Sequence, residues 1–128
     1  MSAMDTARGR ILIVEQSGDH HLYTLSSNSF TSITFTGPSA ASVSNVNGDA
    51  MVYVPAIDRY LVRLGGAGDA VHQIHPSTFE ATSFATTNGA SIPSTINGPY
   101  NKFLYVPRLQ GCVYVPSYSG NAWFLRVH

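Results

Sequence analysis

The chain has 128 residues with seven basic and seven acidic side chains, so its formal net charge at pH 7 is zero. This balance argues against the basic surface that binds nucleic acid or an anionic membrane. Charged residues make up only 11% of the chain, against about 25% in an average globular domain. Cys112 is the single cysteine, so no disulfide can form within the chain. We therefore expect one domain that folds without a disulfide.

The N-terminal sequence MSAMDTARGR lacks the apolar core of a secretory signal. No apolar run approaches the roughly 18 residues that a membrane helix needs. We therefore expect a soluble protein without a signal peptide, located in the cytoplasm or in a virion. Low charge combined with many Ser, Thr, Asn and Gly residues is typical of extracellular and virion-surface β proteins.

From residue 10 onward, short runs of β-branched and aromatic residues alternate with turn residues, which is the pattern of an antiparallel meander. A first unit, about 10–36, predicts three strands: Ile11–Val14, His21–Leu25 and Phe30–Phe35. A second unit, about 51–84, predicts four strands: Met51–Pro55, Arg59–Leu64, Ala70–His75 and Phe79–Phe84. A third unit, about 102–128, predicts three strands: Phe103–Pro107, Cys112–Pro116 and Asn121–Val127. No segment shows helical spacing, so we expect almost no helix.

The three units align with one another, which indicates an internal repeat. At an offset of 49 the first unit matches the second at six positions: Leu22 on Val71, Tyr23 on His72, Leu25 on Ile74, Ser29 on Thr78, Phe30 on Phe79 and Phe35 on Phe84. At an offset of 52, Cys112–Pro116 falls on Tyr60–Leu64. The alignment predicts that the first unit lacks its opening strand and that the third lacks its closing strand.

The second unit resembles a kelch repeat. A strand ending in Gly65-Gly66 is followed by a turn, by Val71-His72-Gln73-Ile74-His75-Pro76 and by a fourth strand from Phe79. The Tyr, Asp and Trp of the family pattern would fall near His72, His75 and Ala81 or Thr82, and this chain has other residues there. The resemblance implies an all-β, antiparallel protein of about three four-stranded, kelch-like β-propeller blades, in a single repeat domain spanning residues 1–128.

Closed propellers need about four to eight blades, so three partial blades cannot form a ring. An open array would expose apolar faces and sheet edges. Three explanations stay open. The chain is a fragment of a larger propeller, two copies join into a ring of about six blades, or the units form a small β-sandwich or barrel.

Candidate catalytic groups are sparse. His72 and His75 are three residues apart on a strand and should point to opposite faces, so one metal ion cannot readily bind both. Cys112, in an apolar strand, is expected to be an inert core residue. Galactose oxidases, which are kelch-like, have a copper site with a Tyr–Cys cross-link, but Cys112 and Tyr114 lie in no matching motif. We expect no catalytic residues, metal or cofactor, and a fragment of such an enzyme is a remote alternative.

Two groups of residues are candidates for ligand binding. Asp19, Asp69 and Asn121 each follow a glycine in the same turn of their unit, where they can form an Asx turn or a repeated ligand contact. Tyr118 and Trp123 belong to an aromatic-rich last unit, and such side chains suit protein interfaces and sugar stacking.

These features favour a non-enzymatic binding or assembly module that is completed by self-association, as a homo-oligomer, or by a partner protein. A virion structural or surface protein is the main variant of this hypothesis. The alternative is a carbohydrate-binding lectin with a glycan partner. We expect no nucleic acid or membrane partner.

Overall fold

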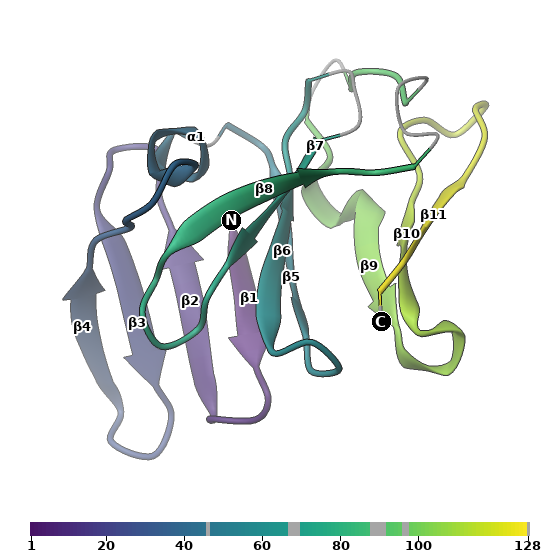
Figure 1. Ribbon diagram of the computed structural model, residues 1–128. Helices are drawn as coiled ribbons and strands as arrows, with labels where there is room; N and C mark the ends of the chain where they lie inside the picture. Colours follow the sequence, from purple (N-terminus) through teal and green to yellow (C-terminus); the bar gives the residue numbers. More distant parts are fainter. Residues whose placement is uncertain (46, 67–69, 88–91, 96–97, 128) are drawn as a thin grey trace.

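The computed structural model describes residues 1–45, 47–66, 70–87, 92–95 and 98–127 (Figure 1). Within these ranges the chain is all-β, with three separate antiparallel sheets of four, four and three strands and no closed barrel. None of the helices there is long and apolar enough to cross a membrane.

The first sheet has the order β1-β2-β3-β4. Its strands are β1 (Ser2–Asp5), β2 (Arg10–Val14), β3 (His20–Thr24) and β4 (Ser29–Ile33). The prediction that this unit lacks an opening strand is therefore wrong. β1 consists of Ser-Ala-Met-Asp, which has no β-branched or aromatic residue. It is a strand because it pairs with β2 along its whole length, from Ser2 opposite Ile13 to Asp5 opposite Arg10.

The second sheet repeats this order, with β5 (Ala50–Val54), β6 (Arg59–Arg63), β7 (Ala70–Ile74) and β8 (Ala81–Ala85). β8 begins two residues later than predicted because Phe79 has a φ of +56°, a left-handed conformation that belongs to the turn. The third sheet contains β9 (Phe103–Val106), β10 (Gly111–Tyr114) and β11 (Trp123–Arg126), with β10 in the centre. Its described residues form three strands, as the repeat predicted.

Strand pairing corrects part of the repeat alignment. The first hairpins match at an offset of 49, because Ser2 pairs with Ile13 and Met51 with Val62. In the next hairpin Ile13 pairs with His21, but Val62 pairs with His72. The turn before β7 is thus two residues longer than the turn before β3. The third and fourth strands of the first unit therefore match those of the second unit at an offset of 51. In the third unit, β9 and β10 match β5 and β6 at an offset of 52, and β11 matches β7 at an offset of 51.

The sheets follow one another side by side, with β1 beside β5 and β5 beside β9 (Figure 1). One buried cluster joins the first and second sheets and another joins the second and third. The only α-helix in the described part is α1 (Ala40–Ser44), where the sequence predicted almost no helix. Val43 is its buried residue and belongs to the first cluster. The core is therefore two apolar layers, each between consecutive sheets.

Candidate functional site

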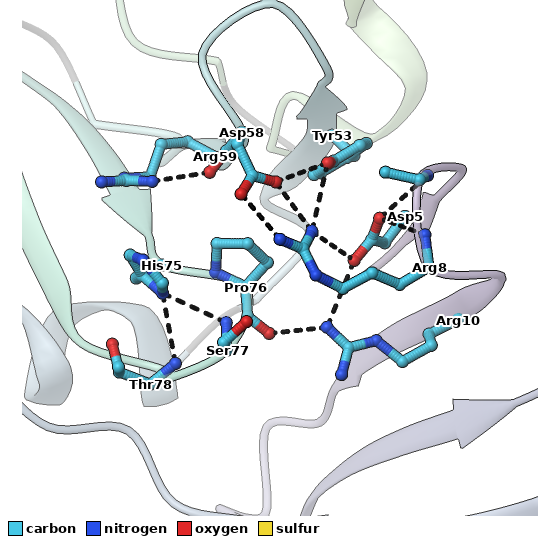
Figure 2. Close-up of polar contacts among 11 residues, drawn as sticks. Asp5, Arg8, Arg10, Tyr53, Asp58, Arg59, His75, Pro76, Ser77 and Thr78 are labelled. Atoms are coloured by element: carbon cyan, nitrogen blue, oxygen red, sulfur yellow. Dashed lines mark hydrogen bonds and ion pairs between the residues drawn. The ribbon is translucent and has the colours of Figure 1, made fainter.

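A network of charged residues connects the first two sheets (Figure 2). Asp5 is fully buried and accepts hydrogen bonds from the backbone N–H of Ala7 and of Arg8, both at 3.1 Å. It also pairs with the guanidinium groups of Arg8 at 3.2 Å and Arg10 at 3.3 Å. Arg10 donates to the carbonyl oxygen of Pro76 at 2.9 Å. The carboxylate is thus saturated, which a buried charge requires.

Arg8 reaches across to the second sheet. Asp58 lies in the β5–β6 turn. The two terminal nitrogens of Arg8 donate to its two carboxylate oxygens, each at 2.7 Å. The hydroxyl of Tyr53 donates to Asp58 at 2.6 Å. Arg8 and then Tyr53 hold the pKa of Asp58 well below its usual range, and Asp58 raises the pKa of Arg8. Burial, followed by the bond to Asp58, raises the pKa of Tyr53 to about 12. We call Asp5, Arg8, Arg10, Tyr53 and Asp58 the Asp5 network; each of these side chains makes at least one hydrogen bond to the others or to the backbone, so we assign it a structural role.

The four histidines in the described ranges lie in strands or directly after one. His20 is buried with its ring 4.8 Å from Phe35, while His21 lies on the opposite face, edge-on to Phe30 at 6.3 Å. His72 is buried, and Nδ1 of His75 accepts the backbone N–H groups of Ser77 and Thr78. Among the described residues no group of three or more His, Cys, Asp or Glu could hold a metal ion.

Cys112 lies in the core, as predicted, and is fully buried. Burial raises the pKa of its thiol to about 12, so the reactive thiolate is suppressed at neutral pH.

The predicted ligand-binding residues are spread over the molecule. Asp19 and Asn121 are exposed in or beside turns, and the backbone N–H of Asp19 donates to the Ser17 hydroxyl at 3.5 Å. Asp69 lies outside the described residues. Tyr118 is fully exposed, and Trp123 is half-buried in β11. No hydrogen bond in the described ranges joins any of these side chains to another, so their role in binding stays a prediction.

Trp123 does line a cavity of about 520 Å³ between the second and third sheets. Its walls contain Arg63, Val71, Thr86, Thr87, Ile92, Phe103, Tyr114, Trp123, Phe124, Leu125 and Arg126. The Arg63 guanidinium lies 5.4 Å from the centre of the Tyr114 ring. Tyr114 is 3% exposed, and its hydroxyl has no hydrogen-bond partner among the described residues. The sequence pointed to Trp123 but not to the buried hydroxyl beside it.

Most of the exposed large hydrophobic side chains in the described ranges lie at the two ends of the array. We call the face of each sheet that points toward the next sheet its tail face, and the opposite face its head face. Paired residues of neighbouring strands share a face, so each face can be followed row by row across the strands.

The head face of the first sheet has the row Met4, Ile11, Tyr23 and Phe30, one residue from each strand. The equivalent row of the second sheet is Tyr53, Tyr60, Ile74 and Ala81. The second row is at most 5% exposed, whereas Met4 is 39% and Phe30 is 65% exposed. The same positions are thus core in the middle sheet and surface in the first sheet.

The tail faces show the same contrast. In the third sheet the row is Leu104, Val113 and Phe124. Leu104 is 58% exposed, whereas its equivalent in the second sheet, Val52, is partly buried against the second apolar cluster. Val113 is half-buried, whereas its equivalents Leu12 and Leu61 are fully buried, and Phe124 is 48% exposed. A Cβ at Gly111 would collide with the Phe124 ring and with the Leu125 carbonyl oxygen, so the absence of a side chain here leaves room for the ring.

We call these surfaces the two end faces. The head end face consists of Met4, Ile11, Ile13, Tyr23 and Phe30. The tail end face consists of Leu104, Val113, Val115 and Phe124, with Leu109 of the β9–β10 turn. The end faces cannot be recognised from the sequence, because the position of its sheet in the array decides whether each of these residues is exposed or buried.

Comparisons with protein-family models, with curated proteins and with solved structures gave no significant match.

Proposed function

We propose that this chain is a non-enzymatic assembly module whose sheets are kelch-like propeller blades, completed by self-association or by a partner chain. One observation carries the proposal. Positions that are buried in the middle sheet, or packed against its core, are apolar and exposed at both ends. Of the nine large hydrophobic residues that are exposed in the described part, six belong to the end faces: Met4, Phe30, Leu104, Leu109, Val115 and Phe124.

The arrangement of the sheets supports the likeness to propeller blades. Each is an antiparallel meander, and the first strands β1, β5 and β9 are neighbours. In propellers the blades stand radially around a central axis. The low charge and the Ser, Thr and Asn content favour a virion structural or surface protein as the setting.

Covering an end face would be strongly favourable. Fully burying a Leu, Val or Phe side chain contributes about 1.5–3 kcal/mol, and exposed apolar patches of this kind mark interaction sites. Two or three such side chains therefore provide enough free energy to offset much of the entropy lost on association.

Light scattering on a gel-filtration column tests the proposal. We expect a mass of at least twice that of one chain for the wild type, and a lower mass for Phe124→Asp, because this change puts a charge in the apolar face. Tyr118→Asp is the matched control, since Tyr118 is exposed but lies outside both end faces. A stable wild-type monomer at about 100 μM, well above the micromolar range of specific weak complexes, would contradict self-association.

The cavity beside Trp123 favours a lectin as the second candidate function. An indole wall and a buried hydroxyl without a partner suit a sugar ring, which stacks on aromatic faces and accepts hydrogen bonds. A glycan array should then give hits that Trp123→Ala abolishes and Tyr114→Phe weakens. Tyr118→Ala should leave these hits unchanged, because Tyr118 does not line the cavity. A blank array with folded protein would contradict this candidate.

A further inference from the structure

Both interfaces inside the chain follow one rule: the tail face of one sheet packs on the head face of the next. The first joins Leu12, Val14 and Leu22 to Tyr60, Val62 and Ile74. The second joins Val54, Leu61 and Val71 to Phe103, Cys112 and Tyr114. All twelve side chains are at most 7% exposed, so this packing mode has been built twice from different residues.

The end faces occupy the positions that form the two sides of the interfaces inside the chain. On the tail side, Leu104 is equivalent to Val52, and Leu109 is equivalent to Ile57. Val52 and Ile57 both pack against the second buried cluster. The tail end face therefore presents apolar side chains at the positions that already make such contacts in the second sheet.

On the head side, Ile11 and Ile13 are equivalent to Tyr60 and Val62, which are fully buried in the first interface. Phe30 packs on Tyr23, with ring centroids 4.8 Å apart. This pair gives the head end face an aromatic surface beside the two isoleucines. The tail end face has the apolar side chains Leu104, Val113 and Phe124.

We infer that a second copy of this chain binds head to tail, with the tail end face of each protomer covering the head end face of the other. This inference rests on the proposed function. Each copy has one tail and one head, so two copies related by a two-fold axis make two identical contacts and leave no end face open. The result is a ring of six sheets, within the range of about four to eight found in propellers.

A mixing experiment tests the arrangement. Phe124→Asp disables the tail and Phe30→Asp disables the head, so each variant alone has both contacts of the ring broken. We expect each to be a folded monomer by light scattering, with a near-UV circular dichroism spectrum like that of the wild type. In an equimolar mixture, the intact tail of Phe30→Asp meets the intact head of Phe124→Asp. Native mass spectrometry should then show a 1:1 heterodimer and no homodimer of either variant.

The control variant is Tyr118→Asp, which changes an exposed residue outside the end faces and should dimerise like the wild type. Tail-to-tail association would make Phe124→Asp monomeric and leave Phe30→Asp dimeric, which overturns the head-to-tail inference but keeps self-association. Failure of the mixture to recover a heterodimer also overturns it. Assemblies that grow beyond two copies would overturn the closed ring. A wild-type monomer would overturn this inference and the self-association part of the proposed function, and would leave completion by a partner chain.

If either variant fails to fold, milder changes keep the test decisive. Leu104→Ser in the tail and Met4→Ser in the head remove apolar contact without introducing a charge. Both side chains are at least 39% exposed, so we expect the substitutions to change the stability of the protomer only slightly, as surface substitutions do. Each should raise the dimer dissociation constant by about tenfold, which corresponds to one partly buried side chain. No change in either would contradict the inference.

Discussion

The interfaces between the first and second sheets and between the second and third sheets occupy equivalent places but are built from different chemistry. The first interface contains Asp5, Arg8 and Asp58, which are joined by ion pairs near the β1–β2 and β5–β6 turns. The equivalent residues of the second are Val54, Ile57 and Gln110. Val54 is fully buried and Ile57 packs against the apolar cluster.

This difference shows that the same backbone arrangement can hold either an ion-paired or an apolar contact, provided that all the partner groups of that contact are present. A buried carboxylate is tolerated where two arginines and two backbone N–H groups surround it, and an aliphatic pair is tolerated where it meets other apolar groups. The third sheet has Val106 and Leu109 at the positions that Asp5 and Arg8 hold in the first sheet. The inferred interface between two copies of the chain would therefore be apolar at these positions, like the second interface.

The largest expected effect comes from breaking the Asp5 network. Asp5→Ala leaves Arg8 and Arg10 without their buried acceptor and should lower the free energy of unfolding by about 3–5 kcal/mol. Val54→Ala, at the equivalent position of the second interface, removes only apolar contact and should cost about 2 kcal/mol. Urea unfolding followed by the fluorescence of Trp123 measures both. A cost of Asp5→Ala no greater than that of Val54→Ala would refute the contrast between the interfaces.

Mild acid should weaken the first interface more than the second. His20 and His72 both lie in the first, and burial lowers the pKa of each below the ordinary value of 6.5, with Arg63 lowering that of His72 further. The unfolded chain therefore binds protons before the folded chain does. Stability is complete above about pH 6.5 and falls as the pH is lowered.

Thermal melts at pH 7.5 and 5.0 test this response. His72→Gln should reduce the loss between the two pH values, because one of the two buried rings is gone. His21→Gln, at a half-buried head-face position, is the control and should retain the loss. An unchanged midpoint for the wild type between pH 7.5 and 5.0 would contradict the prediction.

Two tyrosines of the first interface sharpen the comparison at a smaller scale. Tyr53→Phe removes the bond to Asp58 and should cost about 1–2 kcal/mol. Tyr60→Phe removes a fully buried hydroxyl that has no partner in the described ranges, and should be neutral or stabilising by about 1 kcal/mol. Chemical denaturation distinguishes the two. Equal losses for both variants would mean that the Tyr60 hydroxyl has a bonding partner in solution.

The smallest effect concerns Cys112 in the second interface. Because its thiol is buried and its pKa is raised to about 12, a thiol reagent at pH 8 should leave the native protein unlabelled for hours. Addition of urea should give one labelled thiol per chain. Rapid labelling of the native protein, at the rate of a free thiol, would show that the second and third sheets separate readily.

Much of the fold could be predicted from local patterns. Ten of the strands in the described residues overlap predicted runs, because β-branched and aromatic residues mark strands whatever their neighbours are. β1 was missed because Ser-Ala-Met-Asp carries no such signal, and only its pairing with β2 makes it a strand. The offset predicted for the third and fourth strands was two residues too small. The extra residues lie in a turn, and the length of a turn does not change the apolar pattern of the strands.

The sequence by itself determined the antiparallel class, the repeat and the burial of Cys112, because these follow from alternation along single strands. Only the tertiary structure decided which residues form the end faces and which form the Asp5 network. Asp5 and Asp58 are far apart in the chain, and Ile11 and Tyr60 hold the same place in equivalent strands. Whether such a residue is core or surface depends on the sheet packed against it, and that neighbour is set by the order of the sheets in space.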